Sequence, residues 1–180
     1  MTELIDVLDE NGIKTGRVAT RDEVHREGLW HRIILVAILD DQNHILLQQR
    51  SDNKPTNPGM WDIATAGHVD AGEDSLTAAV REVVEEIGIK IRPSDLRWLM
   101  GCSYSGVRDI HGEQWIIKHI HDGYLLRIPK IDVAELKLQD EEVQAVKLCG
   151  LAEFKQMIVD GTMVNRQPFY EELIKIMEAK

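Results

Sequence analysis

Three glutamates at helical spacing are the residues in this chain whose types and spacing most clearly suggest chemistry. Glu82, Glu85 and Glu86 stand at positions i, i+3 and i+4, so a helix would place their carboxylates on one face. Like charges at this spacing destabilise a bare helix by a few tenths of a kcal/mol, roughly, per pair. A hard divalent cation removes that repulsion, and carboxylate oxygens are the ligands that Mg²⁺ and Mn²⁺ prefer. The face is therefore a candidate metal site, with a solvated acidic surface as the alternative.

Residues on either side of these glutamates could shape such a site. Arg81 lies four residues before Glu85 and eight after Glu73, so its guanidinium can orient carboxylates rather than bind metal. Gly67 and Gly72 would let the preceding loop fold close to the helix and offer backbone carbonyls to the same ion.

The helix that carries the glutamates is predicted over residues 75–87. Asp74 or Ser75 can cap its start, and Gly88 stands where a left-handed C-cap is expected. An apolar stripe at steps of three and four residues completes the amphipathic pattern: Leu76, Ala79, Val80, Val83 and Ile87.

The remaining pattern predicts an α+β fold with a central sheet. Thr20 with Glu23 forms a capping-box signal for a short helix over residues 21–27. Further helices are predicted over 151–159 and 168–179. Strands are predicted over 4–8, 13–18, 33–39, 45–50, 98–104, 114–121, 122–128 and 145–148. We expect one domain, 1–180, with an extension (1–30), a core (31–150) and C-terminal helices (151–180).

The net charge and the cysteines limit the classes of function that this chain can have. The chain has 180 residues and a net charge of −10, with 31 acids against 21 Lys and Arg. Such a chain should be repelled by nucleic acids and anionic membranes. Half of the excess lies in residues 67–89, which hold six acids and one base. With Cys102 and Cys149 far apart, no secretory signal at the start and no long apolar run, we expect a cytoplasmic protein.

Residues 67–89 also carry a family motif. They match the Nudix box, G-x5-E-x7-R-E-U-x-E-E-x-G-U with U aliphatic, at every position. The matching residues are Gly67, Glu73, Arg81, Glu82, Val83, Glu85, Glu86, Gly88 and Ile89. At roughly 7% usage per residue type, seven fixed residues in register arise by chance with a probability on the order of 10⁻⁸. The chain therefore resembles the Nudix hydrolases.

The resemblance implies an α/β/α sandwich with a mixed central sheet, and cleavage of a nucleoside diphosphate linked to another moiety. It implies that Glu82, Glu85 and Glu86 bind Mg²⁺, or Mn²⁺, together with a backbone oxygen of Gly67. Glu73 and Arg81 would hold the loop and helix in shape.

A carboxylate must take the proton of the attacking water in such a reaction. Candidates lie in the box and in residues 139–143, where Glu142 is the first choice and Glu141 the second. A solvated turn is the alternative for this second acidic cluster. The residues that we assign to catalysis are Glu73, Arg81, Glu85 and Glu142.

A second resemblance covers much of residues 4–128 outside the box. Segments such as Leu46 to Arg50 and Pro58 to Trp61 are similar to the Nudix-superfamily isomerase of isopentenyl diphosphate. In that enzyme the residues matching Arg21, Arg50 and Lys54 hold the diphosphate, and those matching His25, His31 and His68 bind a divalent metal. A solvated loop is the alternative for Arg50 and Lys54. Hydrogen-bonded or solvent-facing side chains are the alternative for the histidines.

Two departures argue against isomerase chemistry. The isomerase's catalytic cysteine is matched by Ala66, and the second of its paired glutamates by Trp115. His119 and His121 would share one face of a strand, but they show no recognised ligand spacing and are interpreted as ordinary histidines, like His111. Trp61, Trp98 and Trp115 are interpreted as core residues.

The leading hypothesis is a Mg²⁺-dependent Nudix hydrolase that cleaves a phosphoanhydride in a small, nucleotide-like diphosphate, with no nucleic-acid or membrane partner. A homodimer is the default expectation for a small enzyme. The alternatives are an isopentenyl-diphosphate isomerase-like enzyme and a non-catalytic, nucleotide-sensing Nudix domain.

Overall fold

One long strand divides the molecule into two hydrophobic cores. The computed structural model describes residues 3–110 and 112–179, and its strand β3 (His31–Leu39) is almost completely buried. Side chains of successive β3 residues point to opposite faces of the sheet. Ile33, Leu35 and Leu39 therefore enter one core, whereas Ile34 and Val36 enter the other. A sheet covered on both faces explains why this segment is continuously apolar.

The central sheet is mixed and has seven strands. Its main path runs β5-β4-β3-β8-β7, with β6 paired to β3 and β9 paired to β4. Among the strands of the described residues, β3 and β8 pair in parallel and the other strand pairs of this sheet are antiparallel. The strands besides β3 are β4 (Ile45–Arg50), β5 (Trp61–Ile63), β6 (Thr65–His68), β7 (Leu96–Ile110), β8 (Glu113–Arg127) and β9 (Val143–Cys149).

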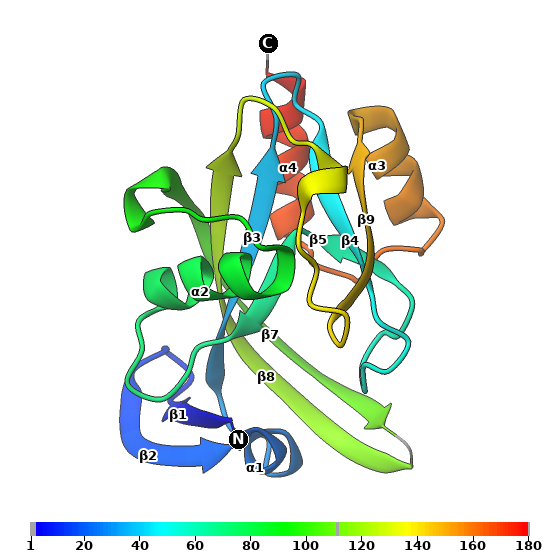
Figure 1. The fold of residues 1–180 in the computed structure, drawn as a ribbon. Coiled ribbons are helices and arrows are strands. Elements are labelled where there is room, and N and C mark those ends of the chain that lie inside the picture. Colours follow the sequence, from blue (N-terminus) through cyan, green and yellow to red (C-terminus); the bar gives the residue numbers. More distant parts are fainter. Residues whose placement is uncertain (1–2, 111, 180) are drawn as a thin grey trace.

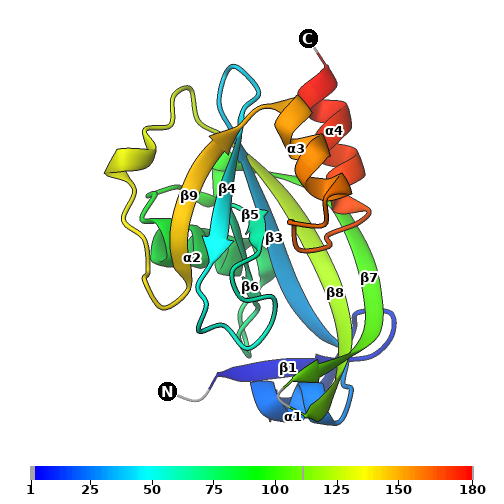
Figure 2. The same cartoon turned by 90° about the vertical axis from the view of Figure 1, so that its right-hand side faces the viewer.

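Helices cover both faces of this sheet, so that the predicted sandwich is confirmed. Helix α2 (Ser75–Ile87) packs with Ala78, Ala79 and Val83 against one face. Helices α3 (Leu151–Val159) and α4 (Phe169–Glu178) cover the other through Phe154 and Phe169. Figure 2 shows the three layers, with α2 and the pair α3–α4 on opposite sides of the strands.

The N-terminal extension forms a separate small layer at one end of the sheet (Figure 1). Strands β1 (Leu4–Leu8) and β2 (Lys14–Thr20) make an antiparallel hairpin, followed by α1 (Arg21–Arg26). The predicted capping box is present, because Thr20 accepts a hydrogen bond from the Glu23 backbone N–H and the Glu23 carboxylate accepts from that of Thr20. The extension brings α1 next to β8 and thereby delivers side chains to the site described below.

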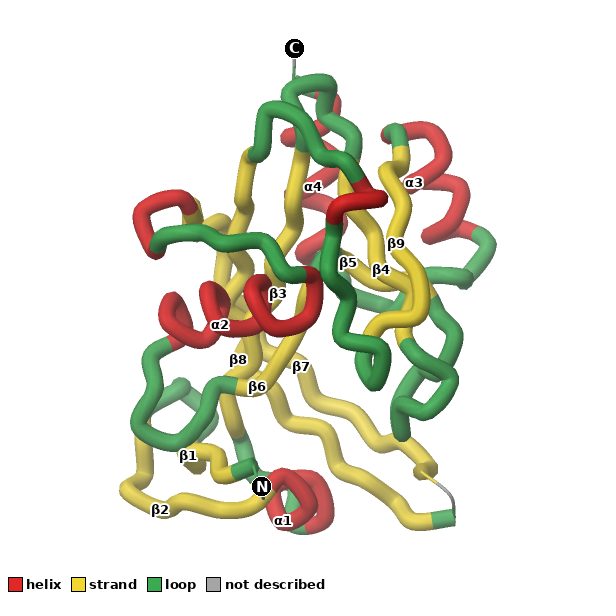
Figure 3. The backbone as a smooth tube through the Cα atoms, in the orientation of Figure 1, coloured by secondary structure: helices red, strands yellow, loops and turns green. Residues whose placement is uncertain are grey.

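The structure corrects several of the predicted elements. Residues 114–121 and 122–128 were expected as two strands, but β8 is continuous because Asp122 pairs with Ile34 on one side and Gly101 on the other. Gly123 is required there, since the ring of Phe169 occupies the place of a Cβ atom. The short strands β5 and β6 lie in a region interpreted as loop or left unassigned (Figure 3).

The prediction that Trp98 is a core residue is wrong. Its side chain is 58% exposed because it lies on β7, the edge strand of the sheet. Cys102 and Cys149 are both free thiols, as expected. Within residues 3–110 and 112–179, no helix combines the length and apolar character needed to cross a membrane.

Candidate active site

Helix α2 presents the glutamates of the box in two different environments. Its start is fixed by the Asp74 side chain, which accepts a hydrogen bond from the Thr77 backbone N–H at 2.8 Å, and it ends at Gly88 with φ 72°. Glu86 is buried and Glu82 largely so, whereas the Glu85 side chain is 54% exposed. The predicted shared face therefore exists, but its edge, at Glu85, faces solvent.

Arg81 ties the loop before α2 to the helix. Its guanidinium donates to both carboxylate oxygens of Glu73, at 3.2 and 3.0 Å, and to Glu82 at 2.8 Å. It also donates to the backbone carbonyl of His68 at 3.0 Å and to Glu85 at 3.3 Å. This fork of contacts is the orienting arrangement expected from the spacing, and a single ammonium group could not make it.

The two buried carboxylates fit a divalent cation. Burial raises the pKa of Glu86 to about 8 and that of Glu82 to about 7. Such groups are costly to ionise unless a positive charge meets them. Glu86 accepts one hydrogen bond from Gln48, at 3.1 Å, and the Glu82 carboxylate lies against Gly67, where a Cβ atom would collide with it. An all-oxygen donor set of carboxylates and a backbone carbonyl suits Mg²⁺ or Mn²⁺.

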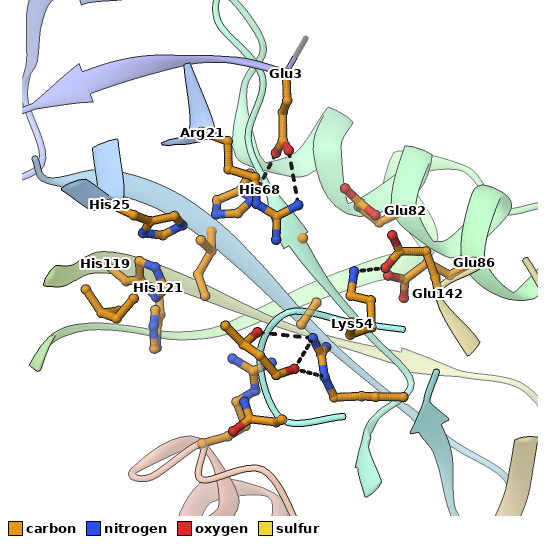
Figure 4. A pocket seen from close by; sticks show the side chains of 18 of the residues that line it. Glu3, Arg21, His25, Lys54, His68, Glu82, Glu86, His119, His121 and Glu142 are labelled. Atoms are coloured by element: carbon orange, nitrogen blue, oxygen red, sulfur yellow. Dashed lines mark hydrogen bonds and ion pairs between the residues drawn. The ribbon is translucent and has the colours of Figure 1, made fainter. Parts of the chain in front are cut away.

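Glu142 lines the same cavity close to Glu86 and is paired with Lys54 (Figure 4). The Gln139 backbone N–H donates to the Glu86 carbonyl at 3.0 Å, so the acidic turn is attached to the end of α2. Of the two carboxylates weighed in this turn, Glu142 lines the cavity and Glu141 is exposed. Figure 4 shows Lys54 reaching Glu142 beside Glu82 and Glu86.

Basic side chains line the rest of a cavity of about 680 Å³. Arg50 is buried and donates to the Thr56 carbonyl at 3.1 and 2.9 Å, so the solvated-loop alternative is wrong for it. Arg21 pairs with Glu3 at 3.5 Å. The structure thus brings all three predicted diphosphate-binding residues, Arg21, Arg50 and Lys54, to one cavity.

Two further arginines of the cavity were not found from the sequence. Arg166 makes two hydrogen bonds to buried Asp62, at 3.1 and 2.6 Å, and Arg108 donates to Asn57 at 2.6 Å. Arg166 precedes α4 and Arg108 lies far along β7. Their sequence neighbours carry no motif, so only the tertiary structure reveals them.

A group of four histidines lies at the other end of the cavity (Figure 4). It comprises His25, His31, His68 and His119, and one ligand atom from each lies within 4.8 Å of the others. The three histidines predicted from the isomerase resemblance thus meet, and His119, interpreted as ordinary, joins them. The parallel register that places His31 opposite His119 brings the two together. His111 lies outside the described residues.

Burial favours the neutral form of three histidines in this group, His25, His31 and His119. Burial lowers the pKa of His25 and of His31 to about 3, and that of His119 well below its ordinary value. Trp115 stacks on His25 with ring centroids 4.7 Å apart. Where the isomerase has a second glutamate, this chain therefore places an aromatic ring against the histidines.

Comparison with known proteins defines the class. The NUDIX domain model matches residues 29–172, so the chain belongs to the Nudix family, and the expected Nudix hydrolase is confirmed at that level. The chain is 39% identical over 163 residues to Nudix hydrolase 3 of Arabidopsis thaliana, covering 87% of this chain but 20% of that protein. It is 32% identical to an uncharacterized Nudix hydrolase of Listeria monocytogenes, covering 88% of this chain and 86% of the relative.

Two further comparisons concern the isomerase resemblance and the fold. An isopentenyl-diphosphate Delta-isomerase of Pectobacterium atrosepticum is 38% identical over 90 residues, covering 50% of this chain and 49% of that enzyme. This confirms a partial similarity. A crystal structure of a Deinococcus radiodurans protein superimposes with a TM-score of 0.70 at 18% identity, covering 98% of this chain and 99% of that one. The Nudix fold is thereby confirmed over nearly the whole chain.

Proposed function

We propose that this protein is a divalent-cation-dependent hydrolase that cleaves a phosphoanhydride bond in a nucleoside-diphosphate-linked or similar diphosphate substrate. The observation that carries the proposal is the pair of buried carboxylates, Glu82 and Glu86, facing a cavity whose other walls hold Lys54 and several arginines. Carboxylates that need a cation and cations that need an anion together match a metal-complexed diphosphate.

The residues of the box have distinct roles in this proposal. Glu82, Glu86, the outer Glu85 and the Gly67 carbonyl hold Mg²⁺, with Mn²⁺ as a substitute. Glu73 and Arg81 are positioning residues, because they fix the loop and the Glu82 carboxylate. When bound, the ion supplies neutralisation of the diphosphate charge and acidification of the attacking water.

The Lys54–Glu142 ion pair gives the proton transfer a structural basis. A substrate phosphate would compete for the Lys54 ammonium and release Glu142 as a free carboxylate. Glu142 then accepts a proton from the water as its oxygen bonds to phosphorus and the bridging P–O bond breaks. Arg50, Arg21, Arg108 and Arg166 spread positive charge along the cavity and orient the diphosphate.

The same family admits a catalytically silent, nucleotide-sensing domain and an isomerase, and the experiment separates them. Phosphate release is measured from a panel of nucleoside diphosphate derivatives and other phosphoanhydrides, with Mg²⁺, Mn²⁺ or EDTA. We expect metal-dependent release that Glu86→Gln abolishes and Glu171→Gln, an exposed change on α4, leaves intact. Ligand binding without turnover across the panel would favour the sensor. Deuterium uptake into isopentenyl diphosphate would favour the isomerase, which Ala66 argues against.

The narrower properties of the protein are part of the proposal. The substrate is nucleotide-like and small, without nucleic-acid or membrane partners, in line with the charge of −10. Two free thiols agree with a reducing compartment, for which we propose the cytoplasm. We also propose that the protein forms a homodimer. Its single domain divides into an extension (1–30), a core (31–150) and C-terminal helices (151–180).

A further inference from the structure

The four histidines meet within the span of a single metal ion. His25 comes from α1, His31 from β3, His68 from β6 and His119 from β8, and their nearest ligand atoms lie within 4.8 Å of one another. Nitrogen ligands at about 2.1 Å from one Zn²⁺ are at most about 4.2 Å apart. Small side-chain adjustments would therefore close these imidazoles around an ion.

Hydrogen bonds behind two of the rings leave their inner nitrogens free. His31 Nδ1 lies 2.9 Å from the Leu29 carbonyl, which can only accept, so this nitrogen carries the hydrogen. His68 Nδ1 lies 2.8 Å from a carboxylate oxygen of Glu3, with the same consequence. A carbonyl or carboxylate behind the ring is the usual support of a metal-binding histidine, because it fixes the tautomer and orientation.

Several of the remaining ring nitrogens are buried without a partner. Among the described residues, His25 Nδ1, His31 Nε2 and His119 Nε2 make no hydrogen bond, and His25 and His31 are only 3% and 0% exposed. Leaving buried polar atoms unsatisfied is costly. One water has two hydrogens to donate, so it cannot satisfy four inward lone pairs, whereas a metal ion accepts all of them.

We propose that His25, His31, His68 and His119 bind one divalent transition-metal ion, with Zn²⁺ as the representative, at a second site in the cavity. His119 is the fourth ligand that the linear sequence does not reveal, and Glu3 is a positioning residue behind His68. An all-imidazole set favours Zn²⁺, Co²⁺ or Ni²⁺ over Mg²⁺, which prefers oxygen ligands. The two ends of one cavity therefore take different metals.

The experiment measures metal binding directly. The full chain is first stripped of metal with EDTA and then saturated with Mg²⁺, which fills the proposed site at Glu82, Glu85 and Glu86, the carboxylate end of the cavity. It is then titrated with Zn²⁺ against a competing chelator, and separately with Co²⁺, whose binding is followed by visible absorption. We expect one equivalent of transition metal and a Co²⁺ spectrum of nitrogen ligation. His119→Asn should weaken Zn²⁺ binding by about 100-fold or more, and Glu3→Gln by about 10-fold, as expected for a ligand and its supporting group.

His121→Asn is the matched control, since His121 lies on the same face of β8, is buried and is outside the group of four. It should retain Zn²⁺ binding, and circular dichroism of the stripped proteins checks that each variant folds. Absence of stoichiometric Zn²⁺ in the folded wild type, or equal affinity in wild type and folded His119→Asn, overturns the proposal. If His119→Asn does not fold, His119→Gln takes its place under the same criterion. Because none of these readouts uses hydrolysis, failure here is distinct from failure of the proposed function.

Discussion

The two ends of the cavity gather their proposed metal ligands in opposite ways. The carboxylate end takes its main ligands from consecutive turns of one helix, α2, and fixes them with one arginine, Arg81. The histidine end takes one ligand from each of four elements, α1, β3, β6 and β8. A helix can preserve its ligand spacing through local hydrogen bonds alone, whereas the histidine group exists only when the sheet and the extension are assembled.

The donor atoms differ as much as the architecture. Oxygen ligands at one end are buried acids whose ionisation is opposed by burial. The proposed nitrogen ligands at the other end are imidazoles, of which His31 is held by a backbone carbonyl and His68 by Glu3. One end of the cavity therefore suits hard cations such as Mg²⁺, and the other suits Zn²⁺ and similar transition-metal ions. Variants at one end should leave metal binding at the other end unchanged.

The largest expected effects come from replacing one proposed metal ligand at each end of the cavity. Glu86→Gln should lower phosphate release by about 10³-fold, because a lost metal ligand removes several kcal/mol of transition-state stabilisation, while Zn²⁺ affinity stays unchanged. His31→Asn should abolish Zn²⁺ binding and leave Mg²⁺ affinity unchanged. Both constants are measured on each variant. Loss of both metals in either folded variant would contradict the independence of the two ends.

A smaller effect is expected at the arginine that braces the carboxylate end. Arg81→Lys keeps the charge but cannot bridge Glu73, Glu82 and the His68 carbonyl at once, so kcat should fall by about 10²-fold. The fall should appear mainly in kcat, since no substrate contact is removed. Arg92→Lys, an exposed arginine paired with Asp95, is the control; a similar loss in that variant would contradict the bracing role.

The contrast between the two ends also explains what could be predicted from the sequence. The helix, the terminating Gly88 and the Glu73–Arg81 contact depend on spacing within a short segment, and each was predicted correctly. The cap was predicted as Asp74 or Ser75, and the structure shows Asp74. His119 was not, because its neighbour His31 lies 88 residues away and the two meet only through the parallel register of β3 and β8.

The same reason accounts for the other omissions. Arg166 donates a hydrogen bond to Asp62, which lies 104 residues earlier in the sequence, and no local sequence pattern predicts that contact. The prediction of two strands in place of β8 was wrong because Asp122 and Gly123 are residue types typical of a turn. In the structure they pair with β3 on one side and β7 on the other. Contacts set by spacing within one segment could be predicted from the residues themselves. Of the side chains assembled from several elements, His25, His31 and His68 were predicted only through the isomerase resemblance.

The carboxylate end should also make the metal-free protein pH-sensitive. Burial raises the pKa of Glu86 in the folded state to about 8, from about 4.5 for an unperturbed glutamate, so the folded state binds more protons than the unfolded state between these values. Stability is then fully present below the unfolded pKa and is lost as pH rises through the folded pKa of about 8, by several kcal/mol. Thermal unfolding between pH 5 and pH 9 (about the range in which these groups titrate) measures it.

Two comparisons identify the source of that pH dependence. Glu86→Gln should flatten the profile, because a neutral amide has no proton to lose, and saturating Mg²⁺ should restore stability at high pH by binding the ionised carboxylates. His31→Asn should leave the slope above about pH 7.5 unchanged, since the imidazole is neutral there both in the folded state, where its pKa is about 3, and in the unfolded state, where its pKa is about 6.5. An equally steep profile in Glu86→Gln would assign the effect to other groups.

The smallest expected effect concerns the N-terminal extension, whose helix α1 supplies His25 to the histidine end of the cavity. Thr20→Ala removes the capping hydrogen bond at the start of α1 and should cost about 1 kcal/mol of stability. Because α1 carries His25, the loss should weaken Zn²⁺ binding modestly while Mg²⁺ affinity stays constant. Thr162→Ala, before Met163 in the C-terminal part of the chain, is a comparable loss of one hydroxyl hydrogen bond at a distance from α1 in the sequence. Equal Zn²⁺ affinity in Thr20→Ala and wild type would show that the sheet strands hold the histidines without help from the helix cap.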